Sequence, residues 1–177
     1  MKPAFSRRHF LKLGLLAAAV PFPALAVAPE RRLGFANLHT GEKVELPYWI
    51  QGEYVPETLA AINHVLRDHR TNQIAAIHTG LLDLLHRVGT ALDTARPFQV
   101  ISGYRSPASN QMLANHSSGV AKRSLHMEGK AIDVRVPGVA LADLQRAALQ
   151  LNGGGVGYYP GSNFVHLDVG RVRAWHG

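Results

Sequence analysis

Hydrophobic residues change their spacing along the chain, and each change predicts a different kind of element. Between Pro56 and Leu92 they recur every three or four positions, which is typical of helices that bury one side. Elsewhere, short alternating or continuous apolar runs predict strands. We expect helices over 56–66, 73–92, 107–114 and 141–151, and strands over 35–39, 44–50, 98–101, 130–136, 156–159 and 164–169.

Turn-forming residues separate these segments and indicate how the strands connect. Residues 40–43 and 160–163 lie between consecutive strands and have the composition of hairpin turns. Pro47 has no backbone N–H to donate, which places its strand at a sheet edge. The glycines at 153–155 follow a helix and precede a strand, the reverse of the order in a phosphate-binding loop. We therefore expect a single α+β domain, with a small, mainly antiparallel sheet packed against helices.

The composition excludes several kinds of chemistry. Of the 177 residues, 46% are hydrophobic and 18% are charged, which argues against a disordered chain. The chain has no cysteine, and this excludes disulfide bonds, cysteine-ligated zinc and thiol nucleophiles. The formal net charge is +7. A positive charge of this size indicates a nucleic-acid partner only if the basic residues cluster in the folded domain.

Residues 1–26 have the order of a secretory signal peptide. Positively charged residues precede an apolar run at 13–20, which is too short to span a bilayer, and small residues follow at Ala24 and Ala26. The segment 6–12 contains two adjacent arginines framed by Ser, Phe, Leu and Lys, and it resembles a twin-arginine export signal. We expect cleavage after Ala26 rather than after Ala28, because Pro29 would directly follow the second site. The alternative to cleavage is an uncleaved membrane anchor.

Loss of this signal peptide changes the expected charge and location. It carries four Lys and Arg residues and no acidic residue, so its removal lowers the net charge from +7 to +3. The remaining basic residues are spread among acids and form no stripe, which argues against a nucleic-acid partner. We expect a periplasmic domain of residues 27–177 that has no stable membrane anchor after cleavage.

Two predicted strands each place a metal-binding side chain on the face away from the core. Because side chains alternate along a strand, Asp133 lies opposite its apolar neighbours, and His166 does the same in the last predicted strand. If the two strands are adjacent, these side chains converge, and a tight turn at Gly129 would bring His126 beside them. Two imidazoles and one carboxylate form the donor set of a catalytic zinc site with an open position for water.

The spacing by itself leaves an alternative open. In that alternative, Asp133 caps a strand end and His166 is a surface histidine. Further histidines on the predicted helices and the first strand are expected at the surface or its boundary, because none has a second ligand at a chelating spacing. These are His39, His64, His69, His78 and His86.

The segment 124–133 carries a resemblance to a known family. Its sequence, Ser-Leu-His-Met-Glu-Gly-Lys-Ala-Ile-Asp, is similar to the Ser-x-His-x-x-Gly-x-Ala-x-Asp motif of the D-Ala-D-Ala metallopeptidases. Ser-Gly-Tyr-Arg-Ser at 102–106 resembles another conserved segment of that zinc peptidase superfamily, and 164–170 resembles its second metal-binding stretch. From about residue 34 to 175, the chain resembles the exported murein endopeptidases called MepK-like.

This resemblance implies a zinc-dependent endopeptidase that hydrolyses amide bonds in the stem-peptide cross-links of peptidoglycan. A bond between two meso-diaminopimelate residues is one candidate. It also implies that His126, Asp133 and His166 bind Zn²⁺ on the sheet. Arg105 would face the substrate carbonyl, and Ser124 would steady the nearby backbone or the substrate.

The chain departs from the family pattern at the general base. Many D-Ala-D-Ala peptidases have a Glu three residues before the second zinc histidine, where this chain has Asn163, which does not accept a proton usefully near neutral pH. We expect Asn163 to contact substrate or support a ligand instead. Asp168 is our candidate catalytic base; in the alternative it orients a metal ligand. His116, in the polar loop expected at 115–123, is a further candidate.

Two other functions fit the same residues. A carboxypeptidase that removes a terminal D-Ala would need a pocket for a free carboxylate, and no second arginine obviously marks one. A non-catalytic zinc module that binds peptidoglycan is consistent with the missing Glu, but the presence of Arg105 argues against it.

Overall fold

The described residues, 29–116 and 121–177 of a computed structural model, form eight strands and four α-helices. The predicted signal peptide, 1–26, and residues 117–120 of the polar loop lie outside them. The strands are β1 Glu30–Asn37, β2 Lys43–Ile50, β3 Glu53–Tyr54, β4 Phe98–Ser102, β5 Ala131–Arg135, β6 Gly155–Tyr159, β7 Phe164–Asp168 and β8 Arg173–His176. The helices are α1 Pro56–Val65, α2 Thr79–Ala91, α3 Pro107–His116 and α4 Leu141–Gln150, with a single 3₁₀ segment, η1 Leu125–Glu128.

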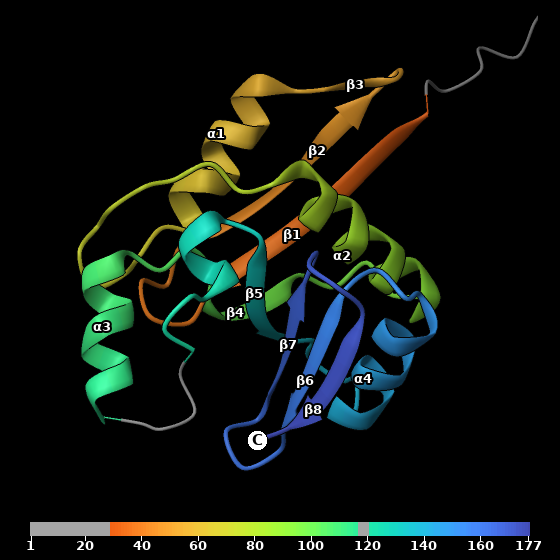
Figure 1. The fold of residues 1–177 in the computed structure, drawn as a ribbon. Coiled ribbons are helices and arrows are strands. Elements are labelled where there is room, and N and C mark those ends of the chain that lie inside the picture. Colours follow the sequence, from red (N-terminus) through yellow and green to blue (C-terminus); the bar gives the residue numbers. More distant parts are fainter. Residues whose placement is uncertain (1–28, 117–120) are drawn as a thin grey trace, which may run out of the picture.

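All described strands belong to one sheet, in the order β3-β2-β1-β4-β5-β7-β6-β8 (Figure 1). The pairs β1–β4 and β6–β8 are parallel, and the other neighbouring pairs are antiparallel. The prediction of an α+β domain with a mainly antiparallel sheet is therefore confirmed. The sheet is mixed, however, and its eight strands make it larger than expected.

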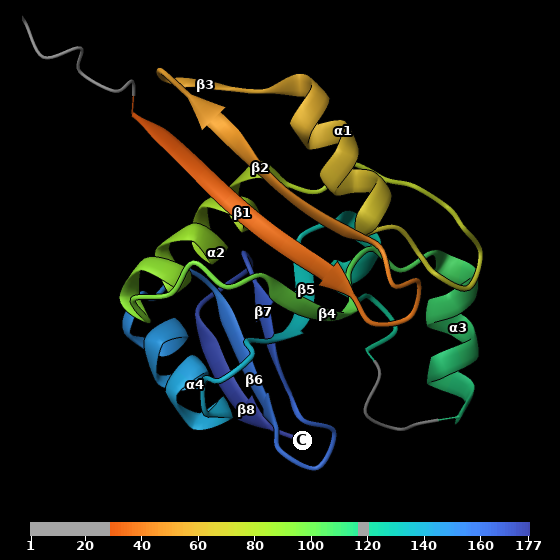
Figure 2. The same ribbon diagram turned by 180° about the vertical axis from the view of Figure 1, so that it is seen from behind.

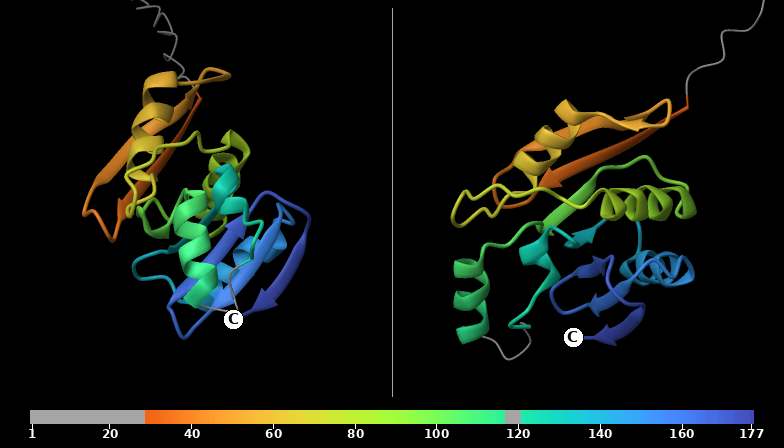
Figure 3. Two further views of the ribbon diagram at one scale, coloured as in Figure 1. Left: turned by 60° about the vertical axis from the view of Figure 1, so that its left-hand side comes forward. Right: turned by 45° about the horizontal axis from the view of Figure 1, so that its top comes forward.

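Three helices pack against the sheet. Helix α1 contacts β1 and β2, α2 contacts β1, and α4 contacts β6, β7 and α2. Figure 2 shows α2 and α4 next to each other and α1 along the β1–β2 hairpin. Figure 3 shows α3 at the other end of the molecule from α4. The fully buried side chains of the core include Phe35, Ile62, Leu81, Leu85, Ile132 and Leu167.

Strand β5 shows why the apolar pattern predicted the sheet. Ile132 and Val134 are fully buried in the core, and Asp133 between them projects from the other face. The prediction that Pro47 lies at a sheet edge is also consistent with the structure. The two-residue strand β3 pairs with Trp49 and Ile50 of β2, so the part of β2 that contains Pro47 has no neighbour on that side among the described strands. The ladder of β1 and β2 is irregular at this point.

The long helix predicted from residue 73 is wrong at its start, because α2 begins at Thr79. The backbone before it makes tertiary hydrogen bonds instead: the Ile77 N–H donates to Asn63 Oδ1 and the His78 N–H to the Gly129 carbonyl, both at 2.9 Å. His78 then caps α2, since its Nδ1 accepts the Gly80 N–H at 3.1 Å. Apolar residues in 73–78 do recur every three or four positions, but the hydrogen bonds to Asn63 and Gly129 keep this segment from forming a helix.

Strands β3 and β8 are absent from the sequence prediction, and β1 begins earlier than expected, at Glu30. These segments are short or rich in charged residues, so they lack an apolar run. Each becomes a strand because a neighbouring strand supplies its backbone partners.

Candidate metal centre

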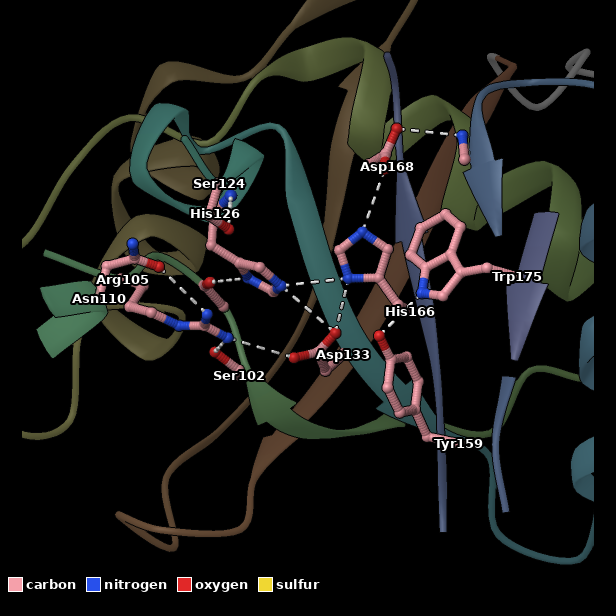
Figure 4. A network of polar contacts seen from close by, with 12 residues as sticks. Ser102, Arg105, Asn110, Ser124, His126, Asp133, Tyr159, His166, Asp168 and Trp175 are labelled. Atoms are coloured by element: carbon pink, nitrogen blue, oxygen red, sulfur yellow. Dashed lines mark hydrogen bonds and ion pairs between the residues drawn. The ribbon is translucent and has the colours of Figure 1, made fainter. Parts of the chain in front are cut away.

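Three side chains that could together bind a metal ion lie on one side of the sheet. His126 comes from η1, Asp133 from β5 and His166 from β7. Asp133 and His166 are direct partners in the antiparallel register of β5 and β7. One ligand atom from each of the three residues lies within 4.8 Å of the others (Figure 4). The structure therefore brings together the three ligands expected from the sequence.

Hydrogen bonds to the outer ring nitrogens set the orientation of both histidines. The Gly103 carbonyl can only accept, so His126 Nδ1 donates to it, at 2.7 Å. His166 Nε2 donates to Asp168 Oδ2 at 3.1 Å. In the neutral rings, these bonds leave a lone pair on the inner nitrogens, His126 Nε2 and His166 Nδ1, and both lone pairs face Asp133.

The inner atoms form a cluster of acceptors that fits a cation. His126 Nε2 and His166 Nδ1 are 3.2 Å apart, and Asp133 Oδ1 lies 3.3 Å and 2.8 Å from them. Burial raises the pKa of the Asp133 carboxyl, but the charges and hydrogen bonds of the two histidines outweigh burial and hold it well below its usual range. The donor set, two nitrogens and one carboxylate oxygen, is one that Zn²⁺ prefers.

Without a metal, a proton would bind to this cluster. Burial lowers the pKa of His166, but its hydrogen bonds to Asp133 and Asp168 outweigh burial and raise the pKa to about 9. A proton and a metal ion therefore compete for His166 Nδ1, the inner nitrogen of this ring, and metal binding releases the proton.

The turn that carries His126 is held by residues on both sides of it. Ser124 caps η1, since its Oγ accepts the His126 N–H at 3.4 Å, and it lines the cavity beside the metal-binding group. Gly129 ends η1 with the predicted positive φ, 64°. A Cβ on Gly129 would collide with the Ala76 carbonyl oxygen. Glycine thus lets the chain turn directly into β5.

Gly129→Ala is expected to destabilise the protein by about 1–3 kcal/mol and to weaken metal binding, because the new Cβ would displace η1 and His126. Urea unfolding and a metal titration would measure the two effects. Gly41→Ala is the matched control: Gly41 has a φ of 74°, but no atom lies within 4 Å of its added Cβ. Equal effects of the two substitutions would show that the Ala76 contact does not hold the turn.

Arg105 lies next to the carboxylate of Asp133. Its Nη2 donates to Asp133 Oδ2 at 3.5 Å and to Ser102 Oγ at 3.3 Å, and its Nη1 donates to Asn110 Oδ1 at 3.4 Å. The side chain is 11% exposed, and burial lowers the pKa of its guanidinium while Asp133 raises it. Its Nε has no hydrogen-bond partner among the described residues. Arg105 therefore places a positive charge in the cavity wall beside the metal-binding group.

Asp168 lies behind His166, on the side away from the inner ligand atoms. Its carboxylate is fully buried and accepts five hydrogen bonds, one from His166, two from Arg173 and one each from the Gly155 and Gly170 N–H groups. Burial raises the pKa of this carboxyl, but these hydrogen bonds outweigh burial and hold the pKa well below its usual range. A carboxylate in this environment is a poor proton acceptor, so the geometry favours orientation of His166 over the role of base.

Asp168→Asn is expected to lower zinc affinity by about 10- to 100-fold, because an amide does not hold the His166 ring as a carboxylate does. Competition with a chelator at neutral pH would measure the zinc affinity of the variant and of the wild type. Asp93→Asn is a suitable control, since Asp93 is exposed and has a φ of 48°, which Asn tolerates. An affinity within twofold of the wild type would rule out the orienting role.

The structure does not bring Asn163 into this group. It is exposed in the turn between β6 and β7, with a φ of 54° that Asn adopts more readily than most residues. Its neighbours Ser162 and Phe164 line the cavity instead. His116 is also exposed, at the end of α3, and its Nδ1 lies 2.7 Å from the Met112 carbonyl of its own helix.

Sequence reasoning missed one wall of the site. A cavity of about 610 Å³ is lined by the three expected metal ligands. It is also lined by Arg105, Ser124 and Asp168. Arg173 and Trp175 also line it, and both lie on β8, which was not predicted. Tyr159, the last residue of β6, lines it as well. The signal available in the sequence was the pair of large side chains, Arg173 and Trp175, two positions apart near the C-terminus.

Comparison with known proteins shows the family of this chain. The family described as peptidoglycan L,D-endopeptidase MepK, Peptidase_M15_2, matches residues 25–175. Peptidoglycan L,D-endopeptidase MepK of Escherichia coli strain K12 is 46% identical over 176 residues, which cover 96% of this chain and 97% of that protein. The probable peptidoglycan L,D-endopeptidase MepK of Haemophilus influenzae is 39% identical over 179 residues, covering 97% and 96%.

Among solved structures, the L-Ala D-Glu endopeptidase ChiX of Serratia marcescens has a TM-score of 0.35 and 24% identity, over 43% of this chain and 62% of that chain. The family match and the relatives span nearly the whole chain, and both include the segments that carry the three metal-binding side chains. The chain therefore belongs to the peptidoglycan L,D-endopeptidase MepK family.

Proposed function

We propose that this protein is a zinc-dependent peptidoglycan endopeptidase that hydrolyses amide bonds in stem-peptide cross-links. The observation that carries the proposal is the convergence of His126, Asp133 and His166, with the outer nitrogens of both histidines already hydrogen-bonded. Three protein ligands leave a coordination position for water, as in catalytic zinc sites. Family membership supports peptide-bond hydrolysis over other zinc-dependent reactions.

When bound, Zn²⁺ would supply a water of lowered pKa and polarise the scissile carbonyl. The chain's own residues hold the ligands and the substrate. Asp168 and the Gly103 carbonyl keep the inner nitrogens of His166 and His126 free to bind the metal. Arg105 stabilises the negative charge that develops on the carbonyl oxygen, and Asp133 and Ser102 hold its guanidinium in place. Ser124 fixes the turn that carries His126.

The cross-link between two meso-diaminopimelate residues is the proposed bond. It is an L,D amide, and the curated relatives are named L,D-endopeptidases. We further propose that residues 1–26 are a twin-arginine signal and that residues 27–177 act in the periplasm, where peptidoglycan is found. Within the described ranges, no helix is long and apolar enough to cross a membrane.

One observation favours a second candidate, a carboxypeptidase. Arg123 is exposed and lines the same cavity, where a guanidinium suits a terminal carboxylate. Arg105 contacts Asp133, and Arg173 is already paired with Asp168 through both oxygens. The two candidates differ in their products, so a single experiment separates them.

The test is mass spectrometry of muropeptides after intact sacculi are incubated with zinc-loaded residues 27–177, beside a chelated sample. We expect cross-linked dimers to decrease and monomers to appear only with zinc, and the fragment masses identify the bond. Loss of a terminal D-Ala alone would indicate the carboxypeptidase. An unchanged profile from a protein that demonstrably holds zinc would refute both and favour a binding module.

A further inference from the structure

Tyr159 and Trp175 form an aromatic wall beside the metal-binding group. Tyr159 ends β6 and Trp175 lies on β8, and both line the cavity that contains His166 and Asp133. The indole of Trp175 lies 5.2 Å from the His166 ring, measured between centroids. Figure 4 shows the Tyr159 hydroxyl directed toward the side of the cavity where Asp133 and His166 lie.

The hydrogen bond between these two aromatic residues has only one possible direction. Indole Nε1 is a donor and never an acceptor, so Trp175 donates to the Tyr159 hydroxyl oxygen, at 2.8 Å. The hydroxyl keeps its own hydrogen. Among residues 29–116 and 121–177, the hydroxyl donates no hydrogen bond and only accepts the one from Trp175. Tyr159 therefore has a donor available to a ligand in the cavity.

Packing holds both rings in place. Gly157 is the register partner of Trp175, and a Cβ on Gly157 would come within 2.6 Å of the indole, so the ring lies directly on the β6 backbone. The Arg173 guanidinium lies 4.8 Å from the centroid of the Trp175 ring on one face. The ring of Tyr159 stacks on Phe164 at 4.6 Å, with 19° between the planes. The hydroxyl is thus directed by fixed neighbours, which is what stabilisation of a transition state requires.

The three metal-binding side chains and the Asp168 carboxylate in this cavity already have partners. His126, Asp133 and His166 are the ligands, and both oxygens of Asp168 accept hydrogen bonds. Arg105 supplies one cationic donor on the Asp133 side. A tetrahedral intermediate concentrates negative charge on one oxygen, and sites that stabilise such an oxygen commonly use more than one donor.

We propose that Tyr159 is a further catalytic residue, whose hydroxyl donates a hydrogen bond to the oxyanion of the tetrahedral intermediate, and that Trp175 is the positioning residue that directs this hydroxyl. The inference rests on the proposed peptidase function. No proton leaves Tyr159 in this role: the hydrogen bond strengthens as the carbonyl oxygen becomes negative and relaxes when the amine departs.

Tyr159→Phe tests the proposal, because it keeps the ring that stacks on Phe164 and removes only the hydroxyl. We expect kcat on purified cross-linked muropeptides to fall about a hundredfold, with KM and zinc affinity unchanged. Tyr158→Phe is the matched control, since Tyr158 is adjacent on β6 but packs against the core and His176, outside the cavity. Its kcat should equal that of the wild type.

Trp175→Phe tests the positioning role separately. It keeps an aromatic ring over Gly157 and removes the N–H, so we expect kcat to fall about tenfold while KM and zinc affinity stay the same. A Tyr159→Phe enzyme with a kcat within twofold of the wild type would overturn the inference. A rise in KM alone, or a loss of zinc, would do so as well. Failure of the wild-type protein to cleave would instead refute the proposed function, and it would be seen before any variant is compared.

Discussion

Asp133→Asn is expected to abolish both zinc binding and hydrolysis of peptidoglycan cross-links. Asp133 is the only carboxylate in the described metal-binding group, and its Oδ1 faces both histidine nitrogens. The amide has nearly the same shape but no charge, and it places a donor or a weak acceptor where an anionic ligand is needed. We expect zinc content to fall from about one ion per chain to near zero. The loss of metal should lower kcat/KM by more than about a thousandfold.

Metal analysis of the purified variant and muropeptide assays with added zinc would measure these effects. The matched control is Asp143→Asn, which changes an exposed carboxylate of α4 that pairs only with Arg146 among the described residues. Circular dichroism would establish that both variants fold. An Asp133→Asn protein that retains zinc and cleaves at a wild-type rate would remove Asp133 from the ligand set.

Arg105→Ala is expected to leave zinc bound and to lower kcat by about a thousandfold. The separation of the two effects follows from the geometry of Asp133, because Oδ2 contacts Arg105 whereas Oδ1 faces the histidines. Removing the guanidinium therefore leaves the inner ligand atoms in place. It also removes a buried charge from beside the position where the carbonyl oxygen becomes negative. KM should change by less than about fivefold, since this interaction is made mainly in the transition state.

Arg105→Lys and Arg146→Ala complete the series. Lysine keeps the charge but not the planar fork that contacts Ser102, Asn110 and Asp133, so its rate should lie between those of the wild type and the alanine variant. Arg146 is exposed on α4, and its removal should have no effect. A wild-type kcat for Arg105→Ala would contradict the assigned role, and loss of zinc would show that Arg105 supports the ligands instead.

The apolar spacing predicted most of the strands because successive side chains of a strand point to opposite faces of the sheet, so that every second residue is apolar where one face is buried. In β5 and β7 this repeat was enough to predict that Asp133 and His166 project away from the core, and the register makes them direct partners. The positive φ of Gly129 was also predictable, since a tight turn was needed between His126 and β5. These features depend on interactions that are local in sequence.

Features that depend on distant partners were not predictable in the same way. Residues 73–78 have helical spacing, yet the backbone of His78 bonds to Gly129, which follows about fifty residues later. Strand β8 has no apolar pattern and exists because it pairs with β6. For the same reason, Trp175 and Arg173 were missing from the predicted site.

The sequence by itself determined which residue types are available for chemistry, the alternation that places Asp133 and His166 on one face, and, through the motif at 124–133, the family. The tertiary structure alone decided what each polar group contacts. It places Asp168 behind His166 with both oxygens occupied, leaves Asn163 in an exposed turn, and sets the Tyr159 hydroxyl beside the ligands. The physical reason is that alternation along a strand is a property of the local backbone. The hydrogen-bond partners of a side chain depend on which distant strands become neighbours, and spacing in the sequence does not record this.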